Sequence, residues 1–303
     1  MPAPSSTALA APAPAAVTSR RGVALLAGAA AAASFISMDS VIKLISPRYD
    51  AFQLSFFRFA SGAVFAVLLW LWHRSPLPQR SAWRLHALRS ALLLVSLVTY
   101  FHALTVLPLA MTVAISYLAP ILVSVLAVLV LHERPSPWIW LALLFGFGGV
   151  FVTLWPELNA SLHGAGSGRL LGIASVGLSA LAFSGVMVLA RQQAQNDSMW
   201  TILLIQNVLP MLLLAVPAGL TWKPVQVADL LQIALAGGFA TVGLLSLTYA
   251  FTRLEASRVA PLEYTSFIWA TALGYVLFGE VPSATTGVSA ALIVTGCLLL
   301  MRR

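Results

Sequence analysis

Apolar residues occupy most of the chain in long runs, and polar residues gather in the short breaks between the runs. A run of about 20 residues, as an α-helix that rises about 1.5 Å per residue, crosses the roughly 30 Å hydrocarbon core of a bilayer. No run alternates polar and apolar side chains, so the strands of a membrane barrel are excluded. We therefore expect an all-α integral membrane protein with ten transmembrane helices, at residues 22–45, 51–72, 85–105, 108–131, 137–155, 169–190, 198–220, 227–251, 258–279 and 282–301.

The composition fits this membrane assignment. Hydrophobic residues make up 60% of the chain and charged residues 9%, whereas a soluble domain carries about a quarter charged residues. Residues 1–19 are mostly Ala, Pro and Ser without any charge, so we expect a disordered cytoplasmic tail. The run after Arg20 and Arg21 continues to Ile45, beyond the about 7 to 15 residues of a signal-peptide core, which favours a retained helix. The single cysteine, Cys297, excludes an intrachain disulfide and a cysteine metal cluster.

The charged residues indicate how the chain is oriented. The formal net charge is +8, but no basic patch interleaved with aromatic residues is present, so we expect no nucleic-acid partner. Cytoplasmic loops of membrane proteins collect Lys and Arg. If the N-terminus is cytoplasmic, the outer loops hold only Arg48, Arg169 and Lys223, and twelve arginines lie inside. We expect both termini in the cytoplasm and the protein in the cell inner membrane. The twelve are Arg20, Arg21, Arg74, Arg80, Arg84, Arg89, Arg134, Arg191, Arg253, Arg258, Arg302 and Arg303.

The stretch from Pro108 to Trp155 recurs in the second half of the chain at an offset of 147 positions. Such self-similarity indicates internal duplication. The fourth expected span runs from outside to inside, and its copy lies five spans later; because five is odd, the direction is reversed. We expect two inverted five-helix repeats, at 20–155 and 169–303, joined by an outer linker at 156–168. The matched pairs are Tyr117/Tyr264, Leu126/Leu273, Glu133/Glu280, Pro135/Pro282, Ser136/Ser283 and Gly149/Gly296.

Inverted repeats are a recurrent architecture of secondary transporters, and the motifs also resemble a known family. The segments 116–120 (SYLAP), 131–136 (LHERPS) and 146–149 (GFGG) resemble the EamA-type repeat of the drug/metabolite transporter superfamily. The segments 253–258 and 274–280 resemble its second repeat. The resemblance covers about residues 22–301 and implies ten helices, a central cavity and movement of small metabolites, often outward. Phe267 stands where the counterpart of Pro120 is often a proline, which departs from a strict symmetry of helix bends.

Charged residues inside apolar spans are informative, because a charge in the bilayer usually faces a cavity or a partner. Asp39 and Lys43 are one helical turn apart, and Arg58 lies at a similar depth in the next span. One hypothesis is that the three line the outer part of a substrate cavity, with the cations binding a carboxylate and Asp39 binding an amine or a proton. The other is a structural Asp39–Arg58 ion pair, with Lys43 extended to the membrane interface.

Glu263 lies near the cytoplasmic end of the ninth span, beside Pro261 and Tyr264. Proline removes a backbone hydrogen bond, which is tolerated where a helix lines water. A buried carboxylate there, like Asp39, is a candidate for proton coupling. The alternative is that Glu263 pairs with Arg253 or Arg258 and anchors the inner end of the span.

Other polar and aromatic residues within the spans are candidates for substrate contact. Aromatic rings can stack on a ligand or cover a cation, and amide groups can bond a substrate or a neighbouring helix. His102 fits a hydrogen-bond partner in helix packing as well as a switch. The further candidate residues for substrate binding are Tyr100, His102, Tyr117, Gln206, Asn207, Tyr264 and Trp269, whereas most other tryptophans fall at span ends, as in an interfacial belt.

The Glu-x-Pro-Ser breaks read as structural features. Glu133 and Glu280 each end a helix just before a Pro-Ser pair, which makes Ser136 and Ser283 N-caps of tight helical hairpins.

These features together predict a secondary transporter that moves a small polar or amphipathic metabolite, with an amino-acid-like zwitterion favoured, by alternating access and in the direction of export. The chain lacks the Gly-x-x-x-x-Gly-Lys loop of ATP-driven transport. The alternatives are an importer of the same family or a membrane-embedded enzyme, although the five histidines are scattered and no nucleophile with its base is visible. We expect no catalytic residue, cofactor or metal, a small-molecule partner, and a monomer or a dimer.

Overall fold

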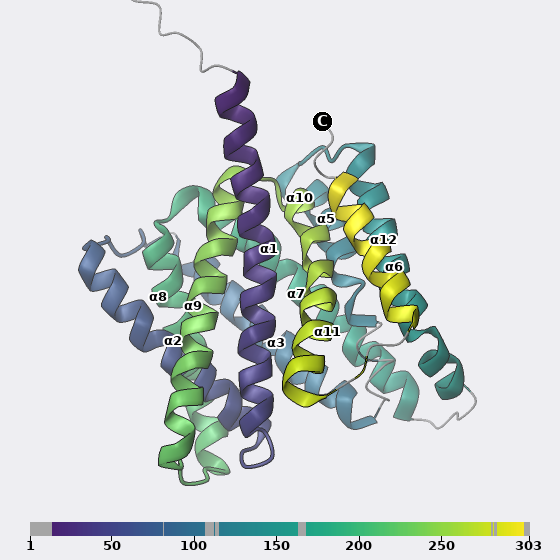
Figure 1. Cartoon of the computed structure of the whole chain (residues 1–303). Coiled ribbons are helices and arrows are strands. Elements are labelled where there is room, and N and C mark those ends of the chain that lie inside the picture. Colours follow the sequence, from purple (N-terminus) through teal and green to yellow (C-terminus); the bar gives the residue numbers. More distant parts are fainter. Residues whose placement is uncertain are drawn as a thin grey trace, which may run out of the picture.

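The computed structural model describes residues 14–80, 82–106, 112, 115–162, 168–279, 281 and 284–299, and every regular element in these ranges is helical (Figure 1). The all-α prediction is confirmed for this part of the chain. The helices are α1 (Pro14–Ile45), α2 (Ala51–His73), α3 (Trp83–Val106), α5 (Ala119–Leu131), α6 (Pro137–Leu162), α7 (Gly168–Asn196), α8 (Met199–Leu220), η1 (Val227–Asp229), α9 (Leu230–Arg253), α10 (Ala256–Val259), η2 (Ala260–Tyr264), α11 (Thr265–Phe278) and α12 (Ala284–Leu299).

Helix lengths and composition support a multi-pass membrane protein. Within the described ranges, five helices are long and apolar enough to cross a bilayer: Arg21–Ile45, Ala51–His73, Leu170–Asn196, Met199–Leu220 and Val227–Arg253. The shorter apolar helices are Ala119–Leu131, Pro137–Val152 and Gly287–Leu299.

The helices depart from the expected boundaries at several places, among them α6, which continues to Leu162 into the expected linker at 156–168. α1 already begins at Pro14, inside the segment 1–19 that was expected to be a tail, and residues 1–13 lie outside the described residues. The start of the expected fourth span, at 108–111, also lies outside them, as do Glu280 and Ser283. The expected ninth span is three consecutive pieces, α10, η2 and α11, because a 3-10 turn that contains Pro261 interrupts the α-helix.

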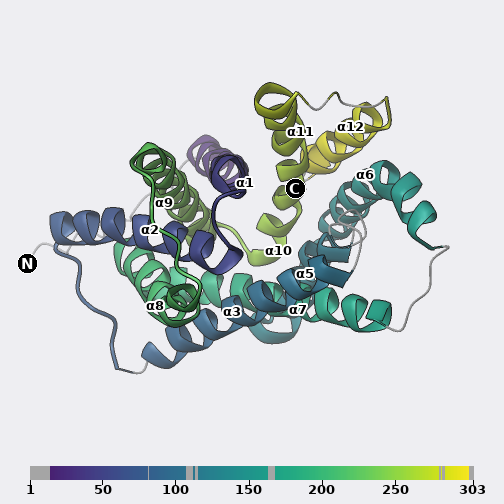
Figure 2. The same cartoon turned by 90° about the horizontal axis from the view of Figure 1, so that it is seen from below.

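Four helix pairs build the bundle. α1 packs along α9, α3 along α7, α2 along α8, and α6 along α12. Figure 2 shows α1, α2, α8 and α9 on one side and α6 with α12 on the other, with α10 near the centre. If each helix is replaced by its counterpart in the other half of the chain, the pair α1–α9 becomes the pair α7–α3. The pairs α2–α8 and α6–α12 each remain the same pair under this replacement.

Two glycines let α6 and α12 approach each other closely. A Cβ atom on Gly149 would lie 2.8 Å from the carbonyl oxygen of Ser289, and one on Gly296 would lie 2.9 Å from the carbonyl oxygen of Ala142. Both obstacles are backbone atoms, which cannot turn aside as a side chain can. The backbone contact between these helices therefore requires glycine at both positions.

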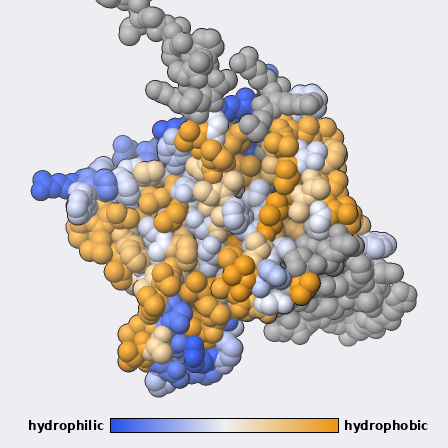
Figure 3. Space-filling view, viewed as in Figure 1, coloured by the Kyte–Doolittle hydropathy of each residue, from blue (hydrophilic) through white to orange (hydrophobic). Residues whose placement is uncertain are grey.

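On the face that Figure 3 shows, apolar side chains cover much of the surface, and strongly hydrophilic residues gather at the upper left and at the bottom. Large apolar side chains are exposed around the bundle, among them Leu68, Leu144, Val216 and Val276. Such a surface would be unstable in water and suits contact with lipid.

Candidate functional site

A cavity of about 290 Å³ lies among helices of both halves of the chain. It is bounded by α1, α2, α3, α7, α8, α9, η2 and α11. Its size is at the lower end of the range for small-molecule sites, about 300 Å³ and above. Apolar side chains such as Phe35, Phe59 and Phe183 form much of the wall. The polar lining residues are Asp39, Arg58, Arg89, Gln206, Asn207, Glu263 and Ser266.

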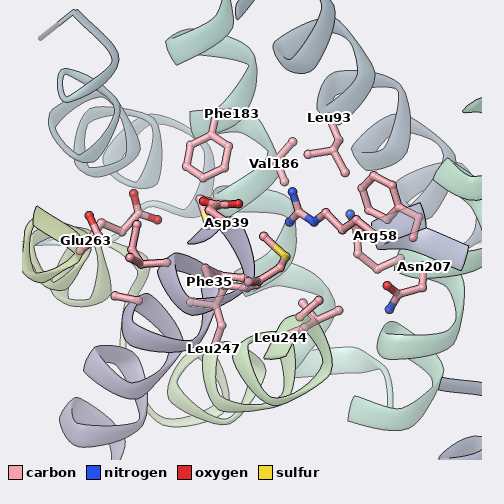
Figure 4. A pocket seen from close by; sticks show the side chains of 18 of the residues that line it. Phe35, Asp39, Arg58, Leu93, Phe183, Val186, Asn207, Leu244, Leu247 and Glu263 are labelled. Atoms are coloured by element: carbon pink, nitrogen blue, oxygen red, sulfur yellow. The ribbon is translucent and has the colours of Figure 1, made fainter. Parts of the chain in front are cut away.

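Asp39 and Arg58, two of the candidate substrate-binding residues, both line this cavity. In Figure 4 the carboxylate of Asp39, from α1, lies between Glu263 on one side and the guanidinium of Arg58, from α2, on the other. Neither side chain has a hydrogen-bond or ion-pair partner within the described part of the chain. The guanidinium carbon of Arg58 lies 5.2 Å from the ring centroid of Phe59, which gives it an aromatic neighbour instead. The two groups form no direct ion pair in the described structure, and their opposite charges attract each other across the cavity.

Glu263 reaches the cavity from the 3-10 turn η2. Its expected structural partners are engaged elsewhere: Arg258 lies 3.4 Å from Glu255, and the guanidinium of Arg253 covers the ring of Tyr249 at 3.8 Å. No hydrogen bond or ion pair to the Glu263 carboxylate is found among the described residues. The break in the helix at Pro261 thus presents to the cavity a carboxylate that forms no ion pair with another described residue.

Arg89, one of the twelve arginines expected on the cytoplasmic side and not proposed as a binding residue, is a buried residue of the cavity wall. It lies in α3, its side chain is only 3% exposed, and it lines the cavity. Its Nη1 donates to Oε1 of Gln193 in α7 at 2.8 Å. The available signal was its position inside the third apolar run, one helical turn before Leu93, which also lines the cavity.

Gln206 and Asn207 line the cavity from α8, and both are buried. The Nδ2 of Asn207 donates to the carbonyl oxygen of Leu203 at 2.8 Å. Its other amide atom lies so close to Gly62 that no side chain fits there, which brings α2 against α8. The two amides add neutral hydrogen-bonding groups to the charged ones.

Six other predicted contact residues are not among those that line this cavity. Lys43 is exposed and lies over the ring of Phe278, 4.2 Å from its centroid. Tyr100 packs against the buried pair of Ala103 and Val176.

His102 bonds Oγ of Ser175 through Nδ1 at 3.0 Å, as expected for helix packing, and Trp269 is 44% exposed. Tyr264 is fully buried in a core cluster, and Tyr117 is stacked on it.

Glu133 has a structural role that the sequence did not specify in detail. Its carboxylate accepts hydrogen bonds from the N–H of Ala256, at 2.9 Å, and from the N–H and hydroxyl of Ser257, at 3.1 and 2.8 Å. It therefore caps the start of α10 in the other half of the chain, and Nε of Arg191 lies 3.8 Å away. Ser136 immediately precedes α6, and its carbonyl oxygen accepts a hydrogen bond from Ile139.

Comparison with known proteins places the chain among transporters. The model of the EamA-like transporter family matches twice, at residues 21–155 and 170–302. The S-adenosylmethionine uptake transporter of Rickettsia felis is 23% identical over 266 residues, which cover 87% of each protein. The pseudopaline exporter CntI of Pseudomonas aeruginosa is 27% identical over 275 residues, 89% of this chain and 92% of the exporter.

A solved crystal structure shares the fold, with a TM-score of 0.77 and 21% identity, and the match covers 92% of this chain and 98% of the other. Because the two family matches take up most of the sequence, the chain belongs to the EamA-like transporter family and is a multi-pass membrane transporter rather than an enzyme.

Proposed function

We propose that this protein is a secondary transporter that moves a small zwitterionic metabolite of the amino-acid type across the inner membrane by alternating access. The observation that carries the proposal is that charged side chains of both signs, Asp39, Arg58 and Glu263 among them, face one cavity and form no ion pair in the described structure. A buried charge is unfavourable unless it is paired. A substrate with both charge signs supplies the missing partners.

The arrangement of the charges matches such a substrate. A carboxylate binds the guanidinium of Arg58, and an amino group binds Asp39 or Glu263, on the other side of the cavity in Figure 4. The rings of Phe35 and Phe183 contact the apolar part of the substrate. S-adenosylmethionine, which the Rickettsia relative is named for taking up, is itself an amino-acid derivative.

The exchange of helix pairs between the halves supports alternating access. In two inverted repeats, each half adopts the conformation of the other, so that the cavity opens to one side of the membrane at a time. In this arrangement the pairs α2–α8 and α6–α12, each made of two equivalent helices, lie around the pseudo-two-fold axis. The axis relates the pair α1–α9 to the pair α3–α7. The two family matches, at 21–155 and 170–302, agree with repeats of this extent.

Export with both termini in the cytoplasm is the direction and orientation that we propose. The excess of arginine on one side supports the orientation. Of the two relatives compared, the exporter is the more identical, at 27% against 23%. Cells that express the protein should become resistant to a toxic amino-acid analogue if the protein exports it. Sensitisation by the same analogue would instead indicate import.

Transport by the purified full-length protein in proteoliposomes tests the substrate class. A competition panel should contain amino acids, nucleosides and simple organic cations, and we expect only zwitterionic amino acids to compete. Arg84→Gln is a matched control for charge, because Arg84 is exposed on α3, and it should transport normally. Competition by nucleosides or organic cations alone would overturn the proposed substrate class. Recovery of a chemically modified compound would indicate an enzyme.

A further inference from the structure

A second cationic group in the cavity forms no ion pair in the described part of the chain. The side chain of Arg89 is only 3% exposed and lines the cavity, and its Nε has no hydrogen-bond acceptor among the described residues. The single partner found for its guanidinium in the described structure is the neutral amide oxygen of Gln193. A buried guanidinium with an unused N–H donor in a cavity wall is the complement of an anionic ligand group.

The acidic residue that directly follows α7 does not form an ion pair with Arg89 in the described structure. Asp197, at the end of α7, bonds Nε2 of His86 at 3.2 Å, and no ion pair joins it to Arg89 in the described ranges. Gln193 is completely buried, and its own Nε2 also lacks an acceptor. The contact between α3 and α7 therefore holds the guanidinium in place through a neutral partner. The positive charge of Arg89 remains able to bind an anionic group of a ligand.

Arg89 and Arg58 reach the cavity from different helices, α3 and α2, which both pack on α8. Two separate guanidinium groups in one cavity fit two separate carboxylates, while Asp39 and Glu263 fit an amine. Resting on the proposed function, we infer that the substrate is an amino acid with a second carboxylate, and that Arg89 binds this second carboxylate while Gln193 positions the guanidinium. Arg89 is then the residue that distinguishes an acidic substrate from its amide.

Matched pairs of acid and amide test this assignment. The probes are L-glutamate with L-glutamine and L-aspartate with L-asparagine, whose second carboxylate is replaced by an amide of similar shape. Binding to the full-length protein in nanodiscs should favour the acid of at least one pair by about tenfold or more, as for loss of one charge-assisted hydrogen bond. A wild type that binds zwitterions of the panel but prefers neither acid would overturn the inference and leave the proposed function intact. A wild type that binds no zwitterion would overturn both.

Variants assign the preference to a residue. Arg89→Gln should lose the preference for the acid over the amide. Arg89→Lys should retain part of it, since the charge remains without the planar fork. Arg84→Gln, on an exposed position of α3, should keep the full preference. An unchanged preference in a folded Arg89→Gln protein contradicts the inference.

Gln193→Glu provides a second route, should Arg89→Gln fail to fold. This change keeps the shape of the side chain and places a carboxylate 2.8 Å from Nη1 of Arg89, where Oε1 now lies. The internal counter-charge should lower the preference for the acid with little effect on the amide. If Gln193→Glu leaves the ratio of acid affinity to amide affinity unchanged, Arg89 is not the residue that binds the second carboxylate.

Discussion

Tyr117 and Tyr264, which occupy equivalent positions in the two halves of the sequence, are stacked on each other. Their ring centroids lie 5.9 Å apart, their planes are inclined by 29°, and the hydroxyl of Tyr264 donates to the carbonyl oxygen of Tyr117 at 3.1 Å. Residues related by a two-fold axis meet only if they lie near that axis. In the proposed inverted architecture, this contact therefore marks where the two halves join.

Gly146 makes room for this tyrosine pair. A Cβ atom at Gly146 would collide with the ring of Tyr264, whereas one at Gly148, on the same helix, would meet nothing within 4 Å. We expect Gly146→Ala to lower the free energy of unfolding by about 1 to 3 kcal/mol, as for overpacking of a core. Gly148→Ala should be neutral or slightly stabilising, because alanine favours helix. Thermal unfolding in detergent measures the difference, and equal melting temperatures of the two variants would contradict this packing.

The same glycine shows what the sequence could and could not predict. The all-α membrane fold, the family and the cavity positions of Asp39, Arg58 and Glu263 follow from hydropathy, motifs and charges inside apolar runs. Tyr264 is likewise a residue with a polar group inside an apolar run of the sequence, yet it is buried in the core. The space for its ring is created by Gly146 on another helix.

Arg89 was missed for a related reason. The excess of arginine in cytoplasmic loops is counted along the sequence, but whether a residue near a span end faces the loop or the bundle depends on helix rotation. That rotation is set by the packing of α3 on α7, which no pattern within α3 specifies. Likewise, the cap that Glu133 supplies to Ser257 joins residues 124 positions apart.

Charge reversal separates binding from structure at Asp39 and Arg58. Asp39→Asn and Arg58→Gln should each lower transport by about tenfold or more, because each removes a charge-assisted contact with the substrate. The double variant with Asp39→Arg and Arg58→Asp should remain inactive, since the charges then face the wrong groups of the ligand. Initial uptake rates in proteoliposomes measure this. Full recovery by the double variant would instead assign the two residues to a structural pair.

Glu263 is the carboxylate we propose for proton coupling, together with Asp39. If Glu263 carries the proton, Glu263→Gln should abolish proton-driven accumulation and flatten the pH dependence of transport, while exchange of substrate continues. The matched control is Glu255→Gln, which removes an exposed carboxylate that pairs with Arg258 outside the cavity. Counterflow at several pH values measures both properties. A Glu263→Gln protein with the wild-type pH profile would exclude this residue as the proton carrier.

Glu133 should be required for stability rather than for substrate recognition. Its carboxylate accepts three hydrogen bonds from Ala256 and Ser257. Glu133→Ala should lower the free energy of unfolding by about 1 to 3 kcal/mol, since two backbone N–H groups lose their acceptor. Glu255→Gln, which breaks only the partly exposed pair with Arg258, should change it by less than about 1 kcal/mol. If both variants melt at the same temperature, the cap contributes no more than a surface pair.

Asp50, at the start of α2 and outside the membrane-spanning segments, should make stability depend on acid pH. Partial burial raises the pKa of its carboxyl group, but hydrogen bonds from Thr221 and from the N–H groups of Gln53 and Phe52 outweigh it, and the net pKa is lowered. A lowered pKa in the folded state means that the stabilisation is complete above the ordinary value of about 4 and is lost as the pH falls below it. Asp50→Asn keeps a side chain that can cap the helix but does not titrate.

The melting temperature of the Asp50→Asn protein should therefore fall less than that of the wild type between about pH 7 and about pH 3. Parallel decreases in the two proteins would assign the acid sensitivity to other carboxylates.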